Sequence, residues 1–316
     1  MLISVIICTY SERRIKDVLE AVDSVLNQSF NNLEIILVVD NNHKLFRFLH
    51  KHYKDDSRVK VLHNIGKRGL SASRNLGVSN AKGNIIAFMD DDAVADENWI
   101  ANIVRNYENP SVIGAGGVVL PIWIAKPSKF LLPEFYWVVG VRYRGYPHKR
   151  IVRNTFGSNF SFRKVVFEKV GLFDTSLGRI GESQISGEEA DFSIRAMLHF
   201  KGGIIVYDPS AVVRHKVFSY RVRLPFIISR LFNTGVAIGV LWMKYRWVKG
   251  LNVLSSETSF LEKVLKVFIP SRLRRVFCKR HALDSMGDLL LIIIYTIIVG
   301  AGFLYGTFKS RRSALL

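Results

Sequence analysis

Three consecutive acids, Asp90 to Asp92, follow an apolar run and suggest a metal site. In an extended chain the side chains of Asp90 and Asp92 project to the same side. Neighbouring carboxylates repel each other unless a cation lies between them, and oxygen ligands suit Mg²⁺ or Mn²⁺, which often also bind phosphate. An acidic surface loop is the ordinary alternative for so short a motif. The position directly after an apolar strand favours the metal.

A second group of acids opens a predicted helix in the segment Gly187-Glu188-Glu189-Ala190-Asp191. A carboxylate here is a candidate general base toward an acceptor hydroxyl. Glu188 and Glu189 point in different directions on a helix, so only one of them can act. The alternative is that acids in a first helical turn simply suit the helix dipole.

Two basic positions are candidates for phosphate or metal contacts. Arg74 lies on a predicted helix after Gly69, and Lys67 and Arg68 lie upstream of it. An ordinary basic turn is the alternative. His215 follows a strand in the segment VVRHKV, where it is either a metal ligand or a structural histidine. The sequence contains neither HExxH nor GxSxG, and Cys8 and Cys278 are too far apart for a CxxC site.

These residues need a scaffold, and the first half of the chain predicts a parallel α/β sheet. Apolar runs at 2–10, 33–40, 59–64 and 84–92 alternate with helical patterns at 12–28 and 71–83. Such strands imply a sheet covered on both faces, with ligands at the carboxyl ends of the strands. Asp40 and the Asp90–Asp92 triplet both lie at those ends. Residues 110–150, rich in Pro, Gly, Trp and Tyr, are predicted to form an irregular floor for a substrate.

The composition of the 316-residue chain fits one large folded domain or two modest ones. Hydrophobic residues make up 49% and charged residues 22%, which excludes disorder as the main state. The net charge is +19, and residues 216–316 hold 17 Lys and Arg against 4 Asp and Glu. So basic a tail suits nucleic acid or an anionic membrane surface.

An apolar segment in the tail favours the membrane. Residues 289–308 carry no charge, and as a helix they would rise about 30 Å, the hydrocarbon thickness of a bilayer. Residues 257–269 show a basic amphipathic pattern. We predict membrane-interface helices over 221–288 and a single span over 289–308 with a short basic tail outside. A membrane-surface helix and a buried core helix are the alternatives.

The motifs together resemble glycosyltransferase family 2, the inverting transferases of GT-A fold. The match covers residues 1–220 in the family's order, through the segments SVIICTY, VVD, GLSASRNLGVSNAKGNIIAFMDDDA, GSNFSFRKVVFEKVGLFD and GEEADFSIR. The stretches EIILVVDNNHKLF and RNTFGSNFSFR are most similar to archaeal glucosyl-dolichyl-phosphate glucuronosyltransferases. The resemblance implies a GT-A domain, a Rossmann-like nucleotide-diphospho-sugar transferase, over 1–220, followed by a mostly helical, membrane-associated segment.

The resemblance also implies residue roles. Thr9 lies at the nucleotide-contacting end of the first strand. Asp40 matches the acid that contacts the uracil of a UDP-sugar, and Arg74 matches an arginine on the nucleotide side of the site. Asp90 and Asp92 match the DxD pair, with Asp92 the direct metal ligand. The remaining roles are a base at Glu189, where the family has aspartate, with Glu188 as the alternative; a substrate contact at Asp191; and a metal or diphosphate ligand at His215.

The implied reaction is an inverting displacement at the anomeric carbon of a UDP-sugar. A Mg²⁺ or Mn²⁺ ion neutralises the leaving diphosphate, and Glu189 takes the acceptor proton. The acceptor is a polyprenyl- or dolichyl-phosphate-linked saccharide at the cell membrane, with the catalytic domain in the cytoplasm and no nucleic-acid partner. The alternatives are a soluble polysaccharide transferase and a non-catalytic protein that binds nucleotide-sugars or nucleic acid.

Overall fold

The computed structural model describes residues 1–142, 148–178, 186–250, 252–277 and 282–313, and Cys278 lies outside them. The chain divides into two compact units. The first, called here the sheet unit, comprises Met1–Ile124, Val139–Ser183 and Glu188–Phe218. The second, the helical unit, comprises Ala125–Val138, Gln184–Gly187 and Ser219–Leu316. The sheet unit holds most of residues 1–220, while residues 125–138, 184–187 and 219–220 belong to the helical unit.

The four predicted N-terminal strands form a parallel array. They are β1 (Ile3–Thr9), β2 (Leu33–Asp40), β3 (Val59–Asn64) and β4 (Ile85–Asp90), in the spatial order β3-β2-β1-β4. Their pairings are all parallel. Their near-continuous apolar sequences follow from burial on both faces of the sheet.

The rest of the nine-stranded sheet is mixed, so the parallel arrangement predicted for the first half of the chain covers β1 to β4. Its strands are β8 (Phe160–Arg163), β6 (Val112–Trp123), β9 (Ile204–Val217), β5 (Ala93–Ala95) and β7 (Arg150–Val152). β8 runs antiparallel to both β4 and β6. The change in strand direction separates the parallel half from the strands that carry later parts of the site.

The irregular floor predicted for residues 110–150 is wrong over the twelve residues of β6. Glycines interrupt this strand, and glycine usually weakens a strand prediction. Here they permit close backbone approach, because a Cβ at Gly117 would lie 1.8 Å from the carbonyl oxygen of Ala211. The glycine content thus marks tight packing of β6 against β9.

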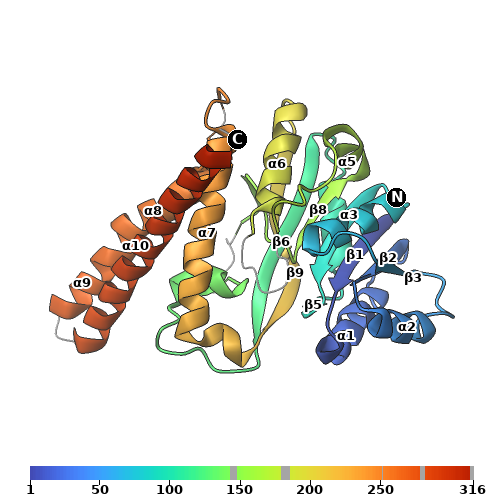
Figure 1. The fold of residues 1–316 in the computed structure, drawn as a ribbon, viewed down its shortest axis with the longest axis horizontal. Helices are drawn as coiled ribbons and strands as arrows, with labels where there is room; N and C mark the ends of the chain where they lie inside the picture. The colour runs from blue at the N-terminus through green and yellow to red at the C-terminus, as the bar shows by residue number, and fades with distance from the viewer. Residues whose placement is uncertain (143–147, 179–185, 251, 278–281, 314–316) are drawn as a thin grey trace. The chain divides into compact units, whose positions relative to one another are not determined.

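Helices cover both faces of this sheet (Figure 1). One core cluster joins it to α1 (Ile15–Leu26), α2 (His43–His52) and α4 (Trp99–Asn106), and contains the fully buried Trp99. The other cluster joins it to α3 (Leu70–Asn80), α5 (Lys164–Val170) and α6 (Glu188–His199). α3 and α6 carry polar site residues, so the apolar packing of the second cluster fixes their positions.

The helical unit consists of α7 (Leu224–Tyr245), α8 (Ser255–Lys263), a π-helical turn η4 (Val264–Phe268), α9 (Ile269–Phe277) and α10 (Ala282–Ser313). Short 3-10 turns, η2 (Pro133–Val139) and η3 (Ser219–Val222), accompany them. By length and composition, Leu224–Tyr245 and Ala282–Arg311 are each suited to cross a membrane. The predicted span at 289–308 falls inside α10, and α7 is a second candidate.

Candidate active site

The site lies at the carboxyl ends of the parallel strands, where the sequence places Thr9, Asp40 and Asp90. After Asp90 the chain turns through Asp91 and Asp92 and enters β5. β5 pairs with β9 in a register that sets Ala93 opposite His215. This pairing brings His215 next to the acidic triplet from far away in the sequence.

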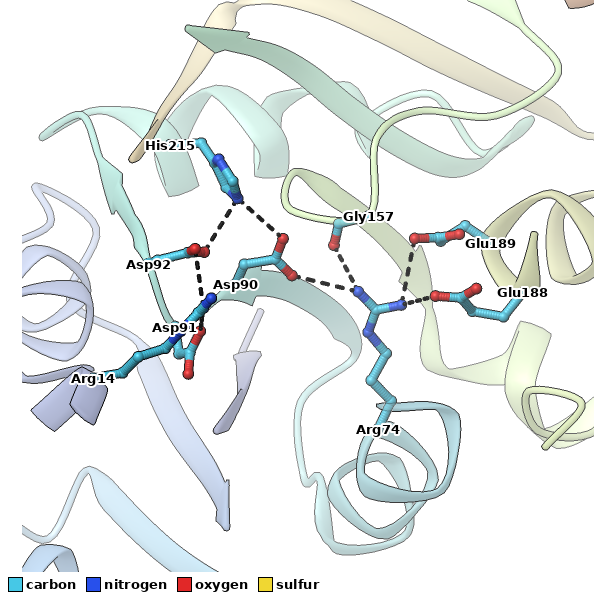
Figure 2. A network of polar contacts seen from close by, with 9 residues as sticks. All are labelled: Arg14, Arg74, Asp90, Asp91, Asp92, Gly157, Glu188, Glu189 and His215. Carbon is cyan, nitrogen blue, oxygen red and sulfur yellow. Dashed lines mark hydrogen bonds and ion pairs between the residues drawn. The ribbon is translucent and has the colours of Figure 1, made fainter. Parts of the chain in front are cut away.

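Asp90, Asp92 and His215 form a cluster that can hold a metal ion. Nε2 of His215 lies 3.1 Å from Oδ1 of Asp92 and 3.6 Å from Oδ2 of Asp90, as Figure 2 shows. One ligand atom from each residue lies within 4.8 Å of the other two. Asp92 and His215 are buried and Asp90 is 27% exposed. Two carboxylates and an imidazole are a donor set that suits Mn²⁺ or Mg²⁺, and the three predicted metal ligands thus lie where they could hold one ion.

The middle acid of the triplet has a different environment. Nη1 of Arg14, on the turn η1 (Glu12–Arg14) after β1, lies 2.7 Å from Oδ1 of Asp91 and 3.0 Å from Oδ2 of Asp92 (Figure 2). Burial raises the pKa of Asp91 to about 6, against the lowering effect of the Arg14 charge. Arg14 thus anchors the triplet. The sequence analysis missed it, because nothing local distinguishes Arg14 from a surface arginine.

Arg74 on α3 connects the metal cluster to the acids of α6. Its buried guanidinium lies 3.0 Å from Oε1 of Glu188, 3.5 Å from Oε1 of Glu189 and 3.6 Å from Oδ1 of Asp90. It also donates a 3.1 Å hydrogen bond to the carbonyl oxygen of Gly157. Figure 2 shows this arrangement. The guanidinium of Arg74 therefore neutralises part of the negative charge of the surrounding carboxylates.

The electrostatics of Arg74 and Asp90 reflect this sharing of charge. Burial lowers the pKa of Arg74, but the carboxylates of Glu189, Glu188 and Asp90 raise it by more, so the side chain is always cationic. Burial raises the pKa of Asp90, but the hydrogen bond and charge of His215 and the charge of Arg74 hold it below its ordinary value. Asp90 is therefore an anion at neutral pH, as a metal ligand must be.

The two glutamates differ in accessibility. The side chain of Glu188 is 2% exposed and makes the shorter contact with Arg74, whereas that of Glu189 is 19% exposed. Gly157 leaves room for Glu189, because a Cβ there would lie 1.9 Å from Oε1 of Glu189. Glu189 is therefore the carboxylate with better access to an incoming hydroxyl.

The other predicted residues lie around this network. Thr9 is buried at the end of β1. Asp40 accepts hydrogen bonds from Nδ2 of Asn64 at 2.8 Å and from the backbone nitrogen of Gly69 at 3.0 Å, so it anchors the loop before α3. Asp191 is fully buried and pairs with Arg195 on its own helix at 2.9 Å, so the network in Figure 2 does not include it.

Comparisons with known proteins identify the family of the chain. The model for "Glycosyl transferase family 2" matches residues 4–171. Over 308 residues the chain is 35% identical to glucosyl-dolichyl phosphate glucuronosyltransferase of Haloferax volcanii, covering 97% of this chain and 96% of the relative.

Two solved structures show the same fold. Mannosyltransferase PcManGT from Pyrobaculum calidifontis, in complex with GDP-Man and Mn²⁺, superposes with a TM-score of 0.64 at 15% identity, covering 96% of this chain and 87% of that one. Staphylococcus aureus TarS 1–349, in complex with UDP-GlcNAc, gives a TM-score of 0.53 at 14% identity, covering 99% and 92%. The predicted GT-A fold is thereby confirmed.

Proposed function

The chain belongs to glycosyltransferase family 2, and from this membership we propose that it transfers glucuronic acid from UDP-glucuronic acid to glucosyl-dolichyl phosphate, with inversion of the anomeric carbon. The observation that carries the proposal is the continuous network from the Asp90, Asp92 and His215 cluster through Arg74 to Glu188 and Glu189. The choice of sugar and acceptor rests on the Haloferax relative, whose similarity extends over nearly the whole of both chains.

Asp90, Asp92 and His215 would hold the divalent ion. When bound there, the ion supplies positive charge to the diphosphate as it leaves. Arg14 contacts Asp92 from the side away from His215 and restrains the orientation of that carboxylate. Asp40 and Thr9, at the ends of neighbouring strands, are the proposed contacts for the uridine of the donor.

Glu189 is the proposed general base. It accepts the proton of the acceptor hydroxyl while the oxygen attacks the anomeric carbon from the face opposite the diphosphate. Arg74 positions both glutamates, and Glu188, the more buried of the two, holds Arg74 in place. We leave Asp191 out of this mechanism, because its carboxylate is buried against Arg195.

The proposed place of action is the cytoplasmic surface of the cell membrane, since UDP-sugars are cytosolic and a dolichyl acceptor is a lipid. The excess of basic residues in 216–316 supports attraction to anionic lipid headgroups. Nucleic acid is not a proposed partner, because carboxylates crowd the site and would repel phosphate in the absence of a metal ion.

The test is to incubate the purified protein and Mn²⁺ with a panel of UDP-sugars, in the presence or absence of glucosyl-dolichyl phosphate. We expect acceptor-dependent release of UDP from UDP-glucuronic acid. Release that needs a lipid-free glycan instead would identify a soluble polysaccharide transferase. Binding of UDP-sugars without turnover under any condition would identify a non-catalytic binding protein.

A further inference from the structure

α7 and α10 lie against each other with their backbones in close contact. Both helices carry a GxxxG pair at the interface: Gly235 and Gly239 on α7, and Gly302 and Gly306 on α10. A Cβ at Gly302 would lie 2.1 Å from the carbonyl oxygen of Phe232, and one at Gly235 would lie 2.1 Å from that of Val299. Small residues at this spacing permit such close helix packing.

The two helices run in the same direction. Gly235 meets Val299 and Gly302, while Gly239, one turn later, meets Phe303 and Thr307. The residue numbers of the contacts therefore increase together on both helices, so α7 and α10 are parallel. Since the glycine contacts align α7 with the apolar part of α10, both helices would cross a bilayer or neither would.

The helices that connect α7 to α10 in the sequence run antiparallel to α10. α9 precedes α10 by a short link and packs against it, with Nε of Arg272 3.5 Å from Oδ2 of Asp288. Further from the link, Phe260 of α8 and Tyr295 of α10 both contact the ring of Phe135, at centroid distances of 5.6 and 5.2 Å. The helical segment 255–277 is thus antiparallel to both α7 and α10.

Two parallel spans would therefore need a third crossing by residues 255–277. This segment, called here the return segment, holds 5 Lys and Arg and 2 Asp and Glu. Its residues Lys266, Arg274 and Arg275 are exposed. A charged residue at the centre of a spanning helix costs about 2.5–3.5 kcal/mol. The return segment is therefore unsuited to cross, and the parallel packing then excludes spanning by α7 and α10.

We propose that the helical unit inserts into a single anionic leaflet, so that neither α7 nor α10 crosses the membrane. This inference rests on the proposed action at a membrane and replaces the single span expected from the sequence.

The surface of α10 suits this arrangement. Its exposed apolar side chains recur at helical spacing and form one stripe along nearly its whole length: Leu283, Met286, Leu290, Ile293, Ile297, Leu304 and Phe308. Leu265 and Phe277, on the return segment, are also apolar and exposed. The apolar stripe lies on α10 and the exposed basic residues lie on 255–277, and together they suit a group of helices in the plane of an anionic interface.

The topology is tested with single cysteines at the two ends of α10. Asp284→Cys, at an exposed polar position beside the apolar stripe, Arg311→Cys and, as a reference on the sheet unit, Lys54→Cys are each made with Cys278→Ser. Burial raises the pKa of the native Cys8 thiol to about 12, and the Cys278→Ser protein without an added cysteine measures the labelling of Cys8 alone. Inverted membrane vesicles and intact cells are treated with a membrane-impermeant maleimide. We expect all three cysteines to react only in inverted vesicles. Reaction of positions 284 and 311 from opposite sides would overturn the proposal.

The lipid partner is tested by sedimentation with vesicles of phosphatidylglycerol and phosphatidylcholine. Replacing Lys266, Arg274 and Arg275 by Gln should weaken binding roughly 100-fold. A matched control replaces three exposed basic residues of the sheet unit, Arg47, Lys51 and Lys54, by Gln and should bind like the wild type. An equal loss of vesicle binding in both variants would overturn the proposal. So would a lipid-free dimer that does not bind vesicles. Sugar transfer is assayed separately, so its failure would count against the proposed function alone.

Discussion

Arg74 is the residue that joins the two chemical tasks of the site. It contacts Asp90 on the proposed metal side and Glu188 and Glu189 on the proposed acceptor side. A single buried guanidinium with fixed geometry can orient several carboxylates at once. The metal cluster and the base are therefore not independent, and substitutions on one side are expected to affect the other.

Asp92→Ala should abolish most of the transfer while leaving the fold intact. It removes a buried ligand from the metal cluster, and metal stabilisation of a leaving group contributes several kcal/mol, so we expect a loss of at least about 100-fold in kcat. Asp91→Asn is the matched control, because Asp91 contacts Arg14 at 2.7 Å and is not part of the cluster. Mn²⁺ binding, measured by electron paramagnetic resonance, should weaken strongly only in Asp92→Ala; equal binding by both variants would refute the assignment.

Glu189→Gln should lower kcat by about 10²- to 10⁴-fold, the usual contribution of a general base. The affinity for the UDP-sugar should change little, because the substitution keeps the shape of the side chain. Glu188→Gln should instead lower thermal stability, since it weakens a buried ion pair with Arg74. If kcat falls steeply for Glu188→Gln and not for Glu189→Gln, the base is Glu188.

The residues of the site differ in how far the sequence predicts them. The acidic triplet and the glutamates stand out because acids after a buried strand or at a helix start are visible in local sequence. Arg14 is not visible, because its role arises from contact with Asp91 and Asp92 across the fold. His215 needs the pairing of β5 with β9 before its position can be known.

At the scale of elements, the junction of β6 and β9 shows why the second half of the sheet was harder to predict. The register of this pair shifts between Gly117 and Val118, and Asp208 lies at the shift. Asp208 accepts hydrogen bonds from Ser210 and Asn106 and pairs with Lys149 at 2.9 Å. Contacts between such distant segments have no signature in the local sequence, whereas the alternation of apolar strands and helices in the first half does.

The environment of Asp208 predicts a pH effect on stability. Burial raises its pKa, but its hydrogen bonds to Ser210, Lys149 and Asn106 lower the pKa by more, so the folded state holds it below the ordinary value. This stabilisation is complete above the unfolded pKa of about 3.9 and is lost as pH falls through the lower folded pKa. Hydrogen-exchange protection of the β9 amides should therefore fall more from pH 6 to pH 3 in the wild type than in Asp208→Asn. Parallel losses in both proteins would contradict this.

Helix packing in the helical unit gives a second prediction at this scale. Gly302→Ala places a Cβ against the carbonyl oxygen of Phe232 and should destabilise the unit by about 1–3 kcal/mol. Gly300→Ala, on the same helix, meets nothing within 4 Å and should stabilise it by up to about 1 kcal/mol through helix propensity. Thermal unfolding of the two variants should shift in opposite directions. A common shift would mean that α7 and α10 do not pack through their glycines.

At the scale of the whole molecule, the chain crosses between its two units more often than the sequence suggests. Residues 125–138 belong to the helical unit, where Phe135 packs against Tyr295 and the carbonyl oxygen of Phe130 accepts a hydrogen bond from the hydroxyl of Tyr295. The basic tail was visible from composition, but these long-range contacts were not. They hold residues 125–138, which lie between β6 and β7 in the sequence, within the helical unit, so a cut at residue 220 would separate buried partners.

The central claim is a metal-dependent, inverting transfer, and the product itself tests it most directly. The protein is incubated with UDP-glucuronic acid, whose sugar is α-linked, glucosyl-dolichyl phosphate and Mn²⁺, and the new glycosidic bond is identified by nuclear magnetic resonance. The account predicts a β-linked glucuronic acid, no product in EDTA, and recovery when Mn²⁺ is restored. An α-linked product, or full transfer in EDTA, would contradict it.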